Sequence, residues 1–469
     1  MTSKRAWEAY PSTYRAREMG ILTHWIQAGE SGAVVGLAGV GKSNLLGFLC
    51  HCSEIVIASP SRGRSIGLAP ILVDLNNLPD NDPSTFYRVV LRSLYEARAQ
   101  LAAVEQSLPT AVQELYRKVE GRTDPFLSQS ALREVLGSFK ENGARLVLVM
   151  DPFDQFCQTA ATQVLDTLRG LRDSFKATLS YIVGLRQELA YLRDPVELGE
   201  LYEILDTHVC RVGPMECEDA RWVISQVEDG MGCSFTDEQA GQLIDLTGGY
   251  PALLRTASLW LAQASPMPDA AAWKEQLLAR PAMQSRLEEM WQGLTGEEQA
   301  ALSVLCTALS SPSEQERQKS IAQVEGKHRR ALDRLQARRL CDETNAGWRI
   351  FPLFAAFVAG VERISGGRIW LDAYTDRFFQ GDKELTHLSA QDRRLLSHFL
   401  NHPISVHSLD DLVEAVWAGY NRQGVSNAAV QQAIRHLREQ IELNPTKPSY
   451  LVTRYGAGYR FFPEGAPQT

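Results

Sequence analysis

The feature that most constrains the fold of this chain is a glycine-rich turn between a short strand and a helix. Residues 33–37 (AVVGL) form an apolar, β-branched run, and the sequence after the turn, KSNLLGFLC, has a helical pattern. The turn, GLAGVGKS from Gly36 to Ser43, has the spacing G-x-x-x-x-G-K-S/T. A phosphate-binding loop requires this order of strand, loop and helix. The sequence therefore predicts a nucleotide-binding α/β fold at this end of the chain.

Each residue type in this P-loop has a physical reason. Glycines let successive backbone N–H groups curl around phosphates, and the helix N-terminus adds partial positive charge. Lys42 reaches the β and γ oxygens, and the Ser43 hydroxyl binds Mg²⁺. A plain glycine-rich turn is the alternative. The predicted nucleotide contacts in the loop are Gly36, Gly39, Val40, Gly41, Lys42, Ser43 and Asn44.

Two acids follow the most apolar strand candidate, RLVLVMD, which ends at Asp151. A P-loop needs an acid at the end of a neighbouring strand to hold Mg²⁺ through water, and we assign Asp151 to this metal. Asp154 either polarises the attacking water or is a solvated acid beside a helix N-terminus. Arg186 closes the strand candidate TLSYIVGLR, where it either senses the γ-phosphate or is a surface arginine. The predicted catalytic residues are Lys42, Asp151, Asp154 and Arg186.

Strand candidates alternate with helices over the first part of the chain, as in a parallel sheet covered by helices on both faces. One such helix is expected to start at Ser128 and stop at Gly143. From about Val212 the pattern is helical, with a polar break over residues 310–320 and then a helix and a short hairpin. The predicted domains are an α/β P-loop NTPase domain (residues 1–205), a helical lid (206–280), a winged helix (281–362) and a second, C-terminal winged helix (367–463).

The chain from about residue 10 to residue 362 resembles the STAND class of P-loop ATPases, relatives of AAA+ proteins that work as nucleotide-controlled switches. The resemblance implies that Arg17 and Glu18 lie near the adenine of ATP or ADP, and that Pro251, on a lid helix, touches the nucleotide. From the residues alone, two surface charges and a helix-breaking turn are the alternatives. The resemblance is carried by the P-loop, Asp151, the box YRARE (Tyr14–Glu18) and Gly249-Tyr250-Pro251.

Two positions depart from the pattern of this class. Many relatives carry a Met-His-Asp triplet whose histidine contacts the β-phosphate of ADP, whereas this chain has Ile350-Phe351-Pro352. Relatives often have Glu after the second acid, whereas Gln155 stands here, and glutamine cannot act as a general base. We therefore expect a slow ATPase that acts as a switch, without the histidine contact to ADP.

Residues 367–463 resemble the OmpR/PhoB-type winged-helix DNA-binding domain over its whole length. The landmarks are a leading sheet, LSAQDRRLLSHFL, LDDLVEAVW, a helix with IRHLREQI, and the hairpin YLVTRYGAGYRF. In the third helix, Val430, Ile434, Leu437 and Ile441 share one face and predict a buried stripe. The opposite, polar face can enter the major groove of double-stranded DNA while the hairpin contacts the minor groove or backbone. The candidate DNA contacts are Gln431, Gln432, Arg435, His436, Arg438, Arg454 and Tyr455.

Charge gives the DNA interpretation limited support. The chain has 48 Lys plus Arg and 56 Asp plus Glu, a net charge of −8, so no chain-wide basic field attracts nucleic acid. The segment from Gly367 to Thr469 has 11 basic and 11 acidic residues, and Glu439 and Glu442 are expected at or near the outer face of the helix. Docking of a protein partner on this winged helix is the alternative.

The chain has no segment that predicts export or a membrane span. Its first twenty residues lack the apolar core of a signal peptide, and no stretch approaches the roughly 20 apolar residues that span a bilayer. Its 8 cysteines show no CxxC pair, which favours reduced thiols. We therefore expect a cytoplasmic protein with no membrane contact.

Together these patterns predict an ATP/ADP-controlled STAND switch whose output is DNA binding. In practice this is a bacterial transcription regulator or a nucleoprotein-assembling ATPase, in which ADP holds the lid closed and ATP opens it for homo-oligomerisation. The alternative is a defence or stress-response component that assembles with a partner protein through the tail winged helix. The sequence shows neither sensor repeats nor an effector-domain pattern, so the sensor or effector is expected to be another molecule, either DNA or a partner chain.

Overall fold

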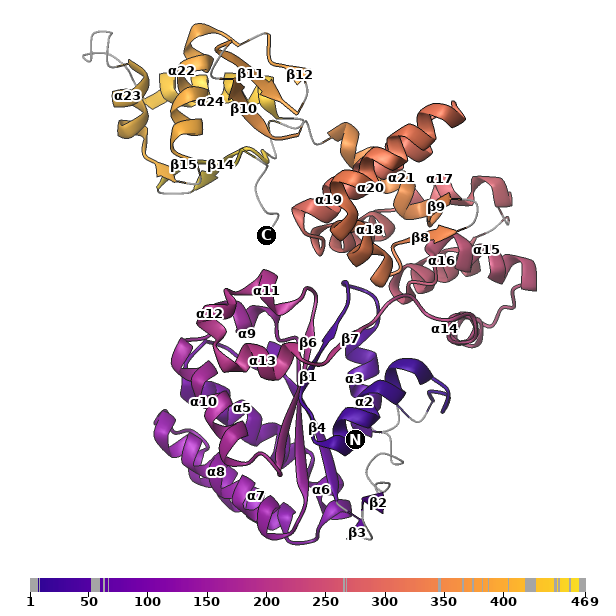
Figure 1. Ribbon diagram of the computed structural model, residues 1–469, viewed down its shortest axis with the longest axis vertical. Coiled ribbons are helices and arrows are strands. Elements are labelled where there is room, and N and C mark those ends of the chain that lie inside the picture. The colour runs from indigo at the N-terminus through magenta and orange to yellow at the C-terminus, as the bar shows by residue number, and fades with distance from the viewer. Residues whose placement is uncertain are drawn as a thin grey trace. The chain divides into compact units, whose positions relative to one another are not determined.

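The fold is described from a computed structural model (Figure 1). The chain divides into two compact units, Met1–Ala355 and Ala356–Thr469, which are described separately below. The described residues are 7, 9–51, 60–61, 64–65, 67–264, 266, 268–344, 347–364, 367–372, 375–381, 383–386, 388–403, 405–417, 427–442, 445, 448–454 and 457–463.

The first unit is built on a five-stranded parallel sheet in the order β4-β5-β6-β1-β7. All residues of β1 and β6 are buried, as expected for a parallel sheet covered on both faces. The strand bounds are β1 Gly32–Val35, β4 Leu68–Asp74, β5 Arg145–Asp151, β6 Leu179–Leu185 and β7 Val209–Arg211, and a separate small hairpin pairs β2 Pro60–Ser61 with β3 Arg64–Ser65.

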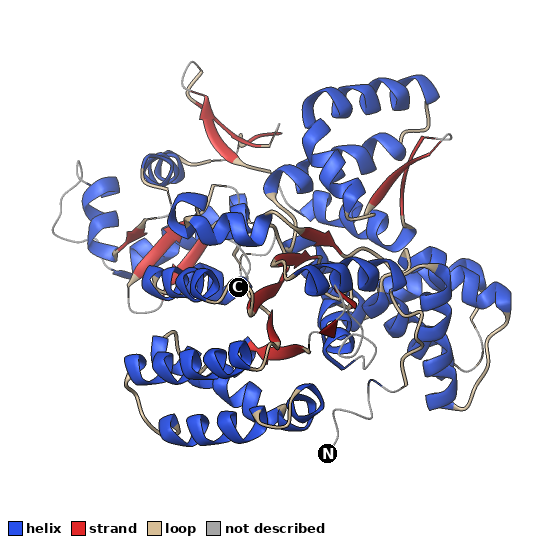
Figure 2. Cartoon of the chain, turned by 60° about the horizontal axis from the view of Figure 1, so that its bottom comes forward, coloured by secondary structure: helices blue, strands red, loops and turns tan. Residues whose placement is uncertain are grey.

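Helices cover both faces of this sheet. In Figure 1, α2 (Ala16–Ala28) and α3 (Lys42–His51) lie on one side of the sheet, and α5 (Pro83–Glu96) and α10 (Thr162–Ser174) lie on the other. Figure 2 shows the same arrangement, with red strands between blue helices. The fold class predicted for this part is therefore confirmed. The remaining helices of this part are η1 Leu75–Asn77, α6 Arg98–Val104, α7 Leu108–Val119, α8 Pro125–Glu141, α9 Asp154–Thr159, α11 Leu189–Leu192, α12 Pro195–Leu198 and α13 Glu200–Asp206.

Two local expectations for this part were wrong. Helix α8 starts at Pro125 rather than at Ser128, because Asp124 caps it by accepting hydrogen bonds from the backbone of Phe126 and Leu127. Strand β7 was missed, and it lies after residue 205, where the α/β domain was expected to end. Three residues are too few to show an alternating pattern, so this edge strand gave no sequence signal.

The rest of the first unit is mainly helical. The polar segment 310–320 was expected to be a break, but α20 already begins at Glu314, capped by Ser313, whose side chain accepts from the backbone of Glu316. The predicted hairpin after this helix is present as an antiparallel pair. The elements are α14 Cys217–Met231, α15 Asp237–Thr247, α16 Pro251–Gln263, η2 Ala270–Ala272, α17 Trp273–Leu278, α18 Pro281–Gln292, α19 Gly296–Leu309, α20 Glu314–Ala337, β8 Cys341–Thr344 and β9 Gly347–Ile350. Helix α21, Pro352–Ile364, begins in this unit and continues into the second.

The second unit has the leading sheet, three helices and terminal hairpin that were expected, and the winged-helix prediction is confirmed. Its core includes Val430, Ile434, Leu437 and Ile441, each at most 2% exposed, so the predicted stripe is buried. The elements are β10 Ile369–Asp372, β11 Arg377–Gln380, β12 Lys383–Glu384, α22 Ala390–Asn401, β13 Val406–His407, α23 Leu409–Trp417, α24 Asn427–Ile441, β14 Leu451–Arg454 and β15 Gly458–Phe461.

In the described part of the chain, no helix is both long and apolar enough to cross a bilayer. No disulfide joins the cysteines within that part.

Candidate functional site

A cavity of about 800 Å³ lies where the P-loop, the ends of β5 and β6, and helices α14, α16 and α18 meet. The P-loop contributes one wall, and the lid helices α14 and α16 form another. All four predicted catalytic residues line this cavity, as do six of the predicted nucleotide contacts: Gly39, Gly41, Lys42, Ser43, Asn44 and Pro251. Gly36 and Val40 belong to the loop but are not among the lining residues.

The first turn of α16 holds the P-loop in place. Gly39 and Gly41 have φ values of 75° and 90°, a left-handed conformation that other residues rarely adopt. The carbonyl of Gly39 accepts a hydrogen bond from the backbone of Ala252, 3.1 Å away, in the first turn of α16. A side chain at Gly39 would also lie 2.8 Å from the Cβ of Ala252. The loop and the N-terminus of α16 therefore approach each other at backbone distance, with Pro251 at the first helical position.

Lys42 is buried and faces the acids of the site. Its Nζ donates to the carbonyl oxygens of Gly36 and Leu37, the second at 3.2 Å. Burial lowers the pKa of Lys42 to about 8, and the charges of Asp151 and Asp154 oppose this shift. An anionic ligand at the loop would favour the charged ammonium further, so the site is electrostatically suited to phosphate.

Asp151 reaches the loop across an intervening strand. It was expected on a strand next to the P-loop strand, but β6 lies between β5 and β1. Burial raises the pKa of the Asp151 carboxyl, and the Ser43 hydroxyl and the Lys42 ammonium oppose this shift. Gly184 of β6 makes this approach possible, because a Cβ there would lie 2.1 Å from Asp151 Oδ1. The two predicted Mg²⁺ ligands are thus brought together by a glycine that sequence reasoning did not single out.

We expect Gly184→Ala to displace the Asp151 carboxylate and to strain the packing around Leu46, whose Cδ1 would lie 3.0 Å from the new methyl group. Overpacking of this kind costs about 1–3 kcal/mol of unfolding free energy. Urea unfolding measures this loss, and titration of ATP with and without Mg²⁺ should show the same loss of Mg²⁺ dependence as in Asp151→Ala. Gly170→Ala in α10 is the control, since no neighbour lies within 4 Å of its added methyl group. A Gly184→Ala protein as stable as the wild type would contradict this explanation.

Asp154 and Arg186 meet at the ends of β5 and β6. Asp154 Oδ1 accepts a hydrogen bond of 2.6 Å from the backbone N–H of Arg186, and its Oδ2 is buried with no partner among the described residues. The Arg186 side chain is exposed and lines the cavity. A carboxylate oxygen without a partner, beside Ser43 and Asp151, fits the oxygen ligands that Mg²⁺ and its water shell require. Gln155 is exposed and is not among the residues that line the cavity.

The far end of the cavity is aromatic. Tyr10 and Tyr14 pack edge to face with ring centroids 4.7 Å apart, and Trp222 of α14 lies 4.6 Å from Tyr10. All three line the cavity, and the buried Tyr14 hydroxyl has no partner among the described residues. Flat aromatic walls of this kind suit a nucleotide base. Sequence reasoning missed these residues, because they come from segments about two hundred positions apart.

The YRARE box contributes differently from what the resemblance implied. Arg17 is exposed and Glu18 is buried, but neither lines the cavity. Arg15 is instead the central residue of the box, only 2% exposed, with a φ of 50°. Its guanidinium donates to the carbonyls of Val40 and Gly213 at 2.7 and 2.8 Å, and Glu18 pairs with it at 3.8 Å. Arg15 therefore ties the P-loop to the segment that leads into the lid.

Ile350-Phe351-Pro352, which replace the Met-His-Asp triplet of relatives, make packing contacts. Phe351 stacks obliquely on Tyr250, with centroids 5.4 Å apart, and its ring would lie 2.6 Å from a Cβ at Gly248. Tyr250 also donates its hydroxyl to the carbonyl of Arg338 at 2.9 Å. The hairpin segment is therefore fixed to the turn before α16 by apolar and hydrogen-bond contacts, with no histidine.

The second unit presents the predicted DNA-contact face on α24. Gln431, Gln432, Arg435 and His436 are exposed there. Arg435 pairs with Glu439 at 3.3 Å, and His436 Nδ1 lies 3.0 Å from Asp392 Oδ2 of α22. Arg454, at the end of β14, is exposed, whereas Tyr455 lies outside the described residues.

Two residues of this helix differ from expectation. Arg438 is half-buried, and its guanidinium donates to the carbonyl of Leu451 at 2.6 and 2.9 Å and to Thr453 Oγ1 at 2.8 Å. Glu442 was expected at the outer face but is only 9% exposed, and its carboxylate accepts from the backbone of Ser449, Tyr450 and Leu451. Both side chains hold the hairpin against α24, so neither is free to contact DNA in this conformation.

Known proteins match the two parts separately. Residues 382–461 match the family described as "Transcriptional regulatory protein, C terminal". In this part the chain is 48% identical over 84 residues to the alkaline phosphatase synthesis transcriptional regulatory protein SphR of Synechococcus elongatus. It is 49% identical over 75 residues to the transcriptional regulatory protein YvrH of Bacillus subtilis. These matches cover 18% and 16% of this chain, and the chain spans about a third of each relative, 32% and 31%.

The first part has its own matches. The Walker-type ATPase paby2304 of Pyrococcus abyssi is 16% identical, with a TM-score of 0.45, and the match covers 74% of this chain and 98% of that protein. The family described as "Novel STAND NTPase 1" matches residues 14–350, which include every residue placed in the cavity from Tyr14 to Glu289. Because that match spans most of the chain, the protein belongs to the Novel STAND NTPase 1 family, with a C-terminal domain of the OmpR/PhoB type.

Proposed function

We propose that this protein is an ATP/ADP-controlled switch whose output is DNA binding by its C-terminal winged helix. The nucleotide-switch part of this proposal is supported by one observation. Residues of the P-loop line the same cavity as Asp151, Asp154, Arg186 and Pro251. A nucleotide in this cavity contacts both the α/β core and the lid helices. ATP and ADP therefore make different contacts with these two parts, because only ATP carries a γ-phosphate. In this proposal ADP keeps the lid closed, and ATP opens it and allows homo-oligomers to form.

Within this proposal, Ser43 and Asp151 hold Mg²⁺, which neutralises phosphate charge when it is bound. The chain's own residues do the rest. In this proposal Lys42 binds the phosphates, and Asp154 orients the water through its Oδ2, which has no partner among the described residues. Arg186, which lines the same cavity, senses the γ-phosphate. The position at which relatives often carry a glutamate holds Gln155, which cannot act as a base and is not among the residues lining the cavity. We therefore propose slow hydrolysis to ADP and phosphate, as suits a timer.

The output half of the proposal rests on the exposed face of α24. Gln432 and Arg435 have the side chains that read adenine and guanine in the major groove, and Arg454 extends from the hairpin. The two relatives are by their names transcriptional regulatory proteins, which supports gene regulation as the role of this chain.

Fluorescence anisotropy tests this function directly. The full chain is titrated onto duplex DNA from its own upstream region and onto unrelated duplex, with ATP, ADP or no nucleotide, at two salt concentrations. We expect selective binding that changes with the nucleotide and weakens steeply with salt. Arg435→Ala should weaken binding to the selected site by about 1–3 kcal/mol, while Arg280→Ala, which removes an exposed arginine of the first unit, serves as a charge-matched control.

Absence of DNA binding with every nucleotide would favour the second candidate, a defence or stress-response component that docks a partner protein through this domain. One observation supports that candidate. Arg438 is engaged with the hairpin and Arg435 with Glu439, so the basic character of the face is low. In that case the sensor or effector is a separate protein.

A further inference from the structure

Helix α18, which belongs to the predicted winged helix rather than to the lid, forms part of the cavity wall. It contributes Arg286 and Glu289, which line the same space as Lys42 and Arg186. The two side chains pair with each other, Nη1 to Oε2 at 3.1 Å, and are 48% and 42% exposed. The winged-helix segment therefore presents a cation to the nucleotide cavity, although its histidine position is occupied by Phe351.

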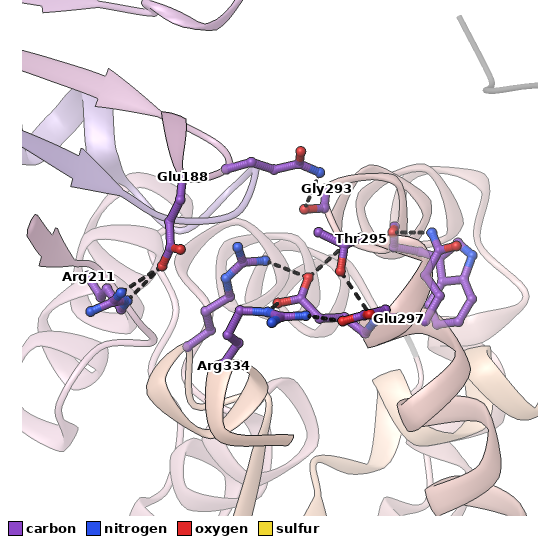
Figure 3. A network of polar contacts seen from close by, with 11 residues as sticks. Glu188, Arg211, Gly293, Thr295, Glu297 and Arg334 are labelled. Carbon is purple, nitrogen blue, oxygen red and sulfur yellow. Dashed lines mark hydrogen bonds and ion pairs between the residues drawn. The ribbon is translucent and has the colours of Figure 1, made fainter. Parts of the chain in front are cut away.

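The position of α18 is fixed by the nucleotide-binding core. Gly293, the residue after the helix, accepts a hydrogen bond at 3.0 Å from the amide of Gln187, which directly follows Arg186 (Figure 3). A Cβ at Gly293 would lie 2.9 Å from Leu37 Cδ2 in the P-loop. One end of α18 is thus held against both the loop and the end of β6, and Arg286 lies two helical turns before this contact.

The charges facing the cavity explain what Arg286 can bind. The lining cations are Lys42, Arg186, Arg255 and Arg286, and the lining acids are Asp151, Asp154 and Glu289. The P-loop amides and Lys42 approach the phosphates from the P-loop side, and Arg286 of α18 lines the same cavity from another element. An ion pair as exposed as Arg286–Glu289 is worth little, whereas an arginine–phosphate contact is bidentate and stronger. A terminal phosphate would therefore replace Glu289 as the partner of Arg286 with little loss of free energy from the broken ion pair.

We propose that Arg286 binds the terminal phosphate of ATP and that Glu289 competes for it when that phosphate is absent. This inference rests on the nucleotide-binding function proposed above and adds the group through which the winged-helix segment distinguishes ATP from ADP. Helix α18, which carries Arg286, ends at the hydrogen bond between Gly293 and Gln187, and α19 begins three residues later.

The test compares the affinities of the full-length protein for ATP and ADP, measured with fluorescent analogues in the presence of Mg²⁺. Arg286→Ala should weaken ATP binding about tenfold to a hundredfold, the loss expected for a hydrogen bond to a charged group, and weaken ADP binding far less. Glu289→Gln should act in the opposite direction and strengthen ATP binding by up to about fivefold. Arg286→Lys should restore part of the ATP affinity. Arg280→Ala is the control, because Arg280 is exposed just before the same helix and is not among the residues lining the cavity.

The outcomes separate this inference from the function on which it rests. A wild-type protein that binds neither nucleotide would overturn the proposed function and the inference with it. A wild type that binds both, with an Arg286→Ala variant that keeps the wild-type ratio of ATP to ADP affinity, would overturn the inference alone. If Arg286→Ala and Glu289→Gln each weakened ATP and ADP binding to the same extent, the ion pair would only stabilise α18. That result would also overturn the inference.

Discussion

Lys42→Ala should reduce ATP and ADP affinity by about thirtyfold or more, since removing one partner of a buried charge contact costs roughly 2–5 kcal/mol. Lys42 is the cation at the centre of the loop, only 9% exposed, and its ammonium already faces the carboxylates of Asp151 and Asp154. Without it those two acids repel the phosphates more strongly. Isothermal titration calorimetry with each nucleotide measures the loss.

Two further variants separate charge from folding. Lys42→Met keeps an unbranched apolar side chain in the buried position and removes only the charge, so it should lose affinity as Lys42→Ala does while retaining the wild-type melting temperature. Lys140→Ala removes an exposed lysine from the last turn of α8 and should bind nucleotide normally. ATP affinity like that of the wild type in the Lys42→Met protein would remove Lys42 from the site.

The parts of the site that could be predicted are those set by local sequence. The P-loop spacing requires particular backbone conformations and one lysine, and Gly39, Gly41 and Lys42 lie where that requirement places them. Asp151 could likewise be placed at the end of its strand, because a strand of buried residues that ends in an acid has few other interpretations next to a P-loop. The number of strands between it and the loop depends on sheet order, which no local pattern encodes.

The Arg15 contact could not be predicted from the motif, but part of the error could have been avoided. Helix α2 buries Leu22, Trp25 and Ile26, and counting back along this stripe places Glu18 on the inner face and Arg17 on the outer one. The periodicity therefore excludes Arg17 from the cavity. It says nothing of Arg15, which precedes the helix in a left-handed conformation and points in a direction that no helical repeat sets.

On the DNA-contact face, too, some residue positions could be predicted from the local sequence and others could not. The stripe from Val430 to Ile441 fixed which residues of α24 point outward, and Gln432 and Arg435 are exposed as expected. Arg438 and Glu442 lie at the edge of that stripe, where a long side chain can turn to either side. Their partners are backbone groups of the hairpin, and these come close only in the folded domain.

Glu298→Ala should lower the unfolding free energy by about 3–5 kcal/mol, because it leaves a buried arginine without a counter-charge. Glu298 is fully buried and pairs with Arg338, itself 4% exposed, at 3.2 Å and with Arg334 at 3.3 Å. The same carboxylate accepts from the backbone of Thr295 at 2.8 Å and completes the capping box of α19. Figure 3 shows this cluster beside the contact between Gln187 and Gly293, which the same change would loosen.

The neighbouring residue provides a matched control. Glu297 pairs with the same Arg334 at 3.0 Å, but its side chain is 73% exposed, so Glu297→Ala should cost at most about 1 kcal/mol. Glu298→Gln keeps an acceptor for Thr295 and removes only the charge, so a loss that persists in this variant is due to the uncompensated Arg338. Urea unfolding followed by tryptophan fluorescence measures all three. Equal losses in Glu297→Ala and Glu298→Ala would mean that water reaches Arg338 and that the buried pair is not what holds α19 and α20 together.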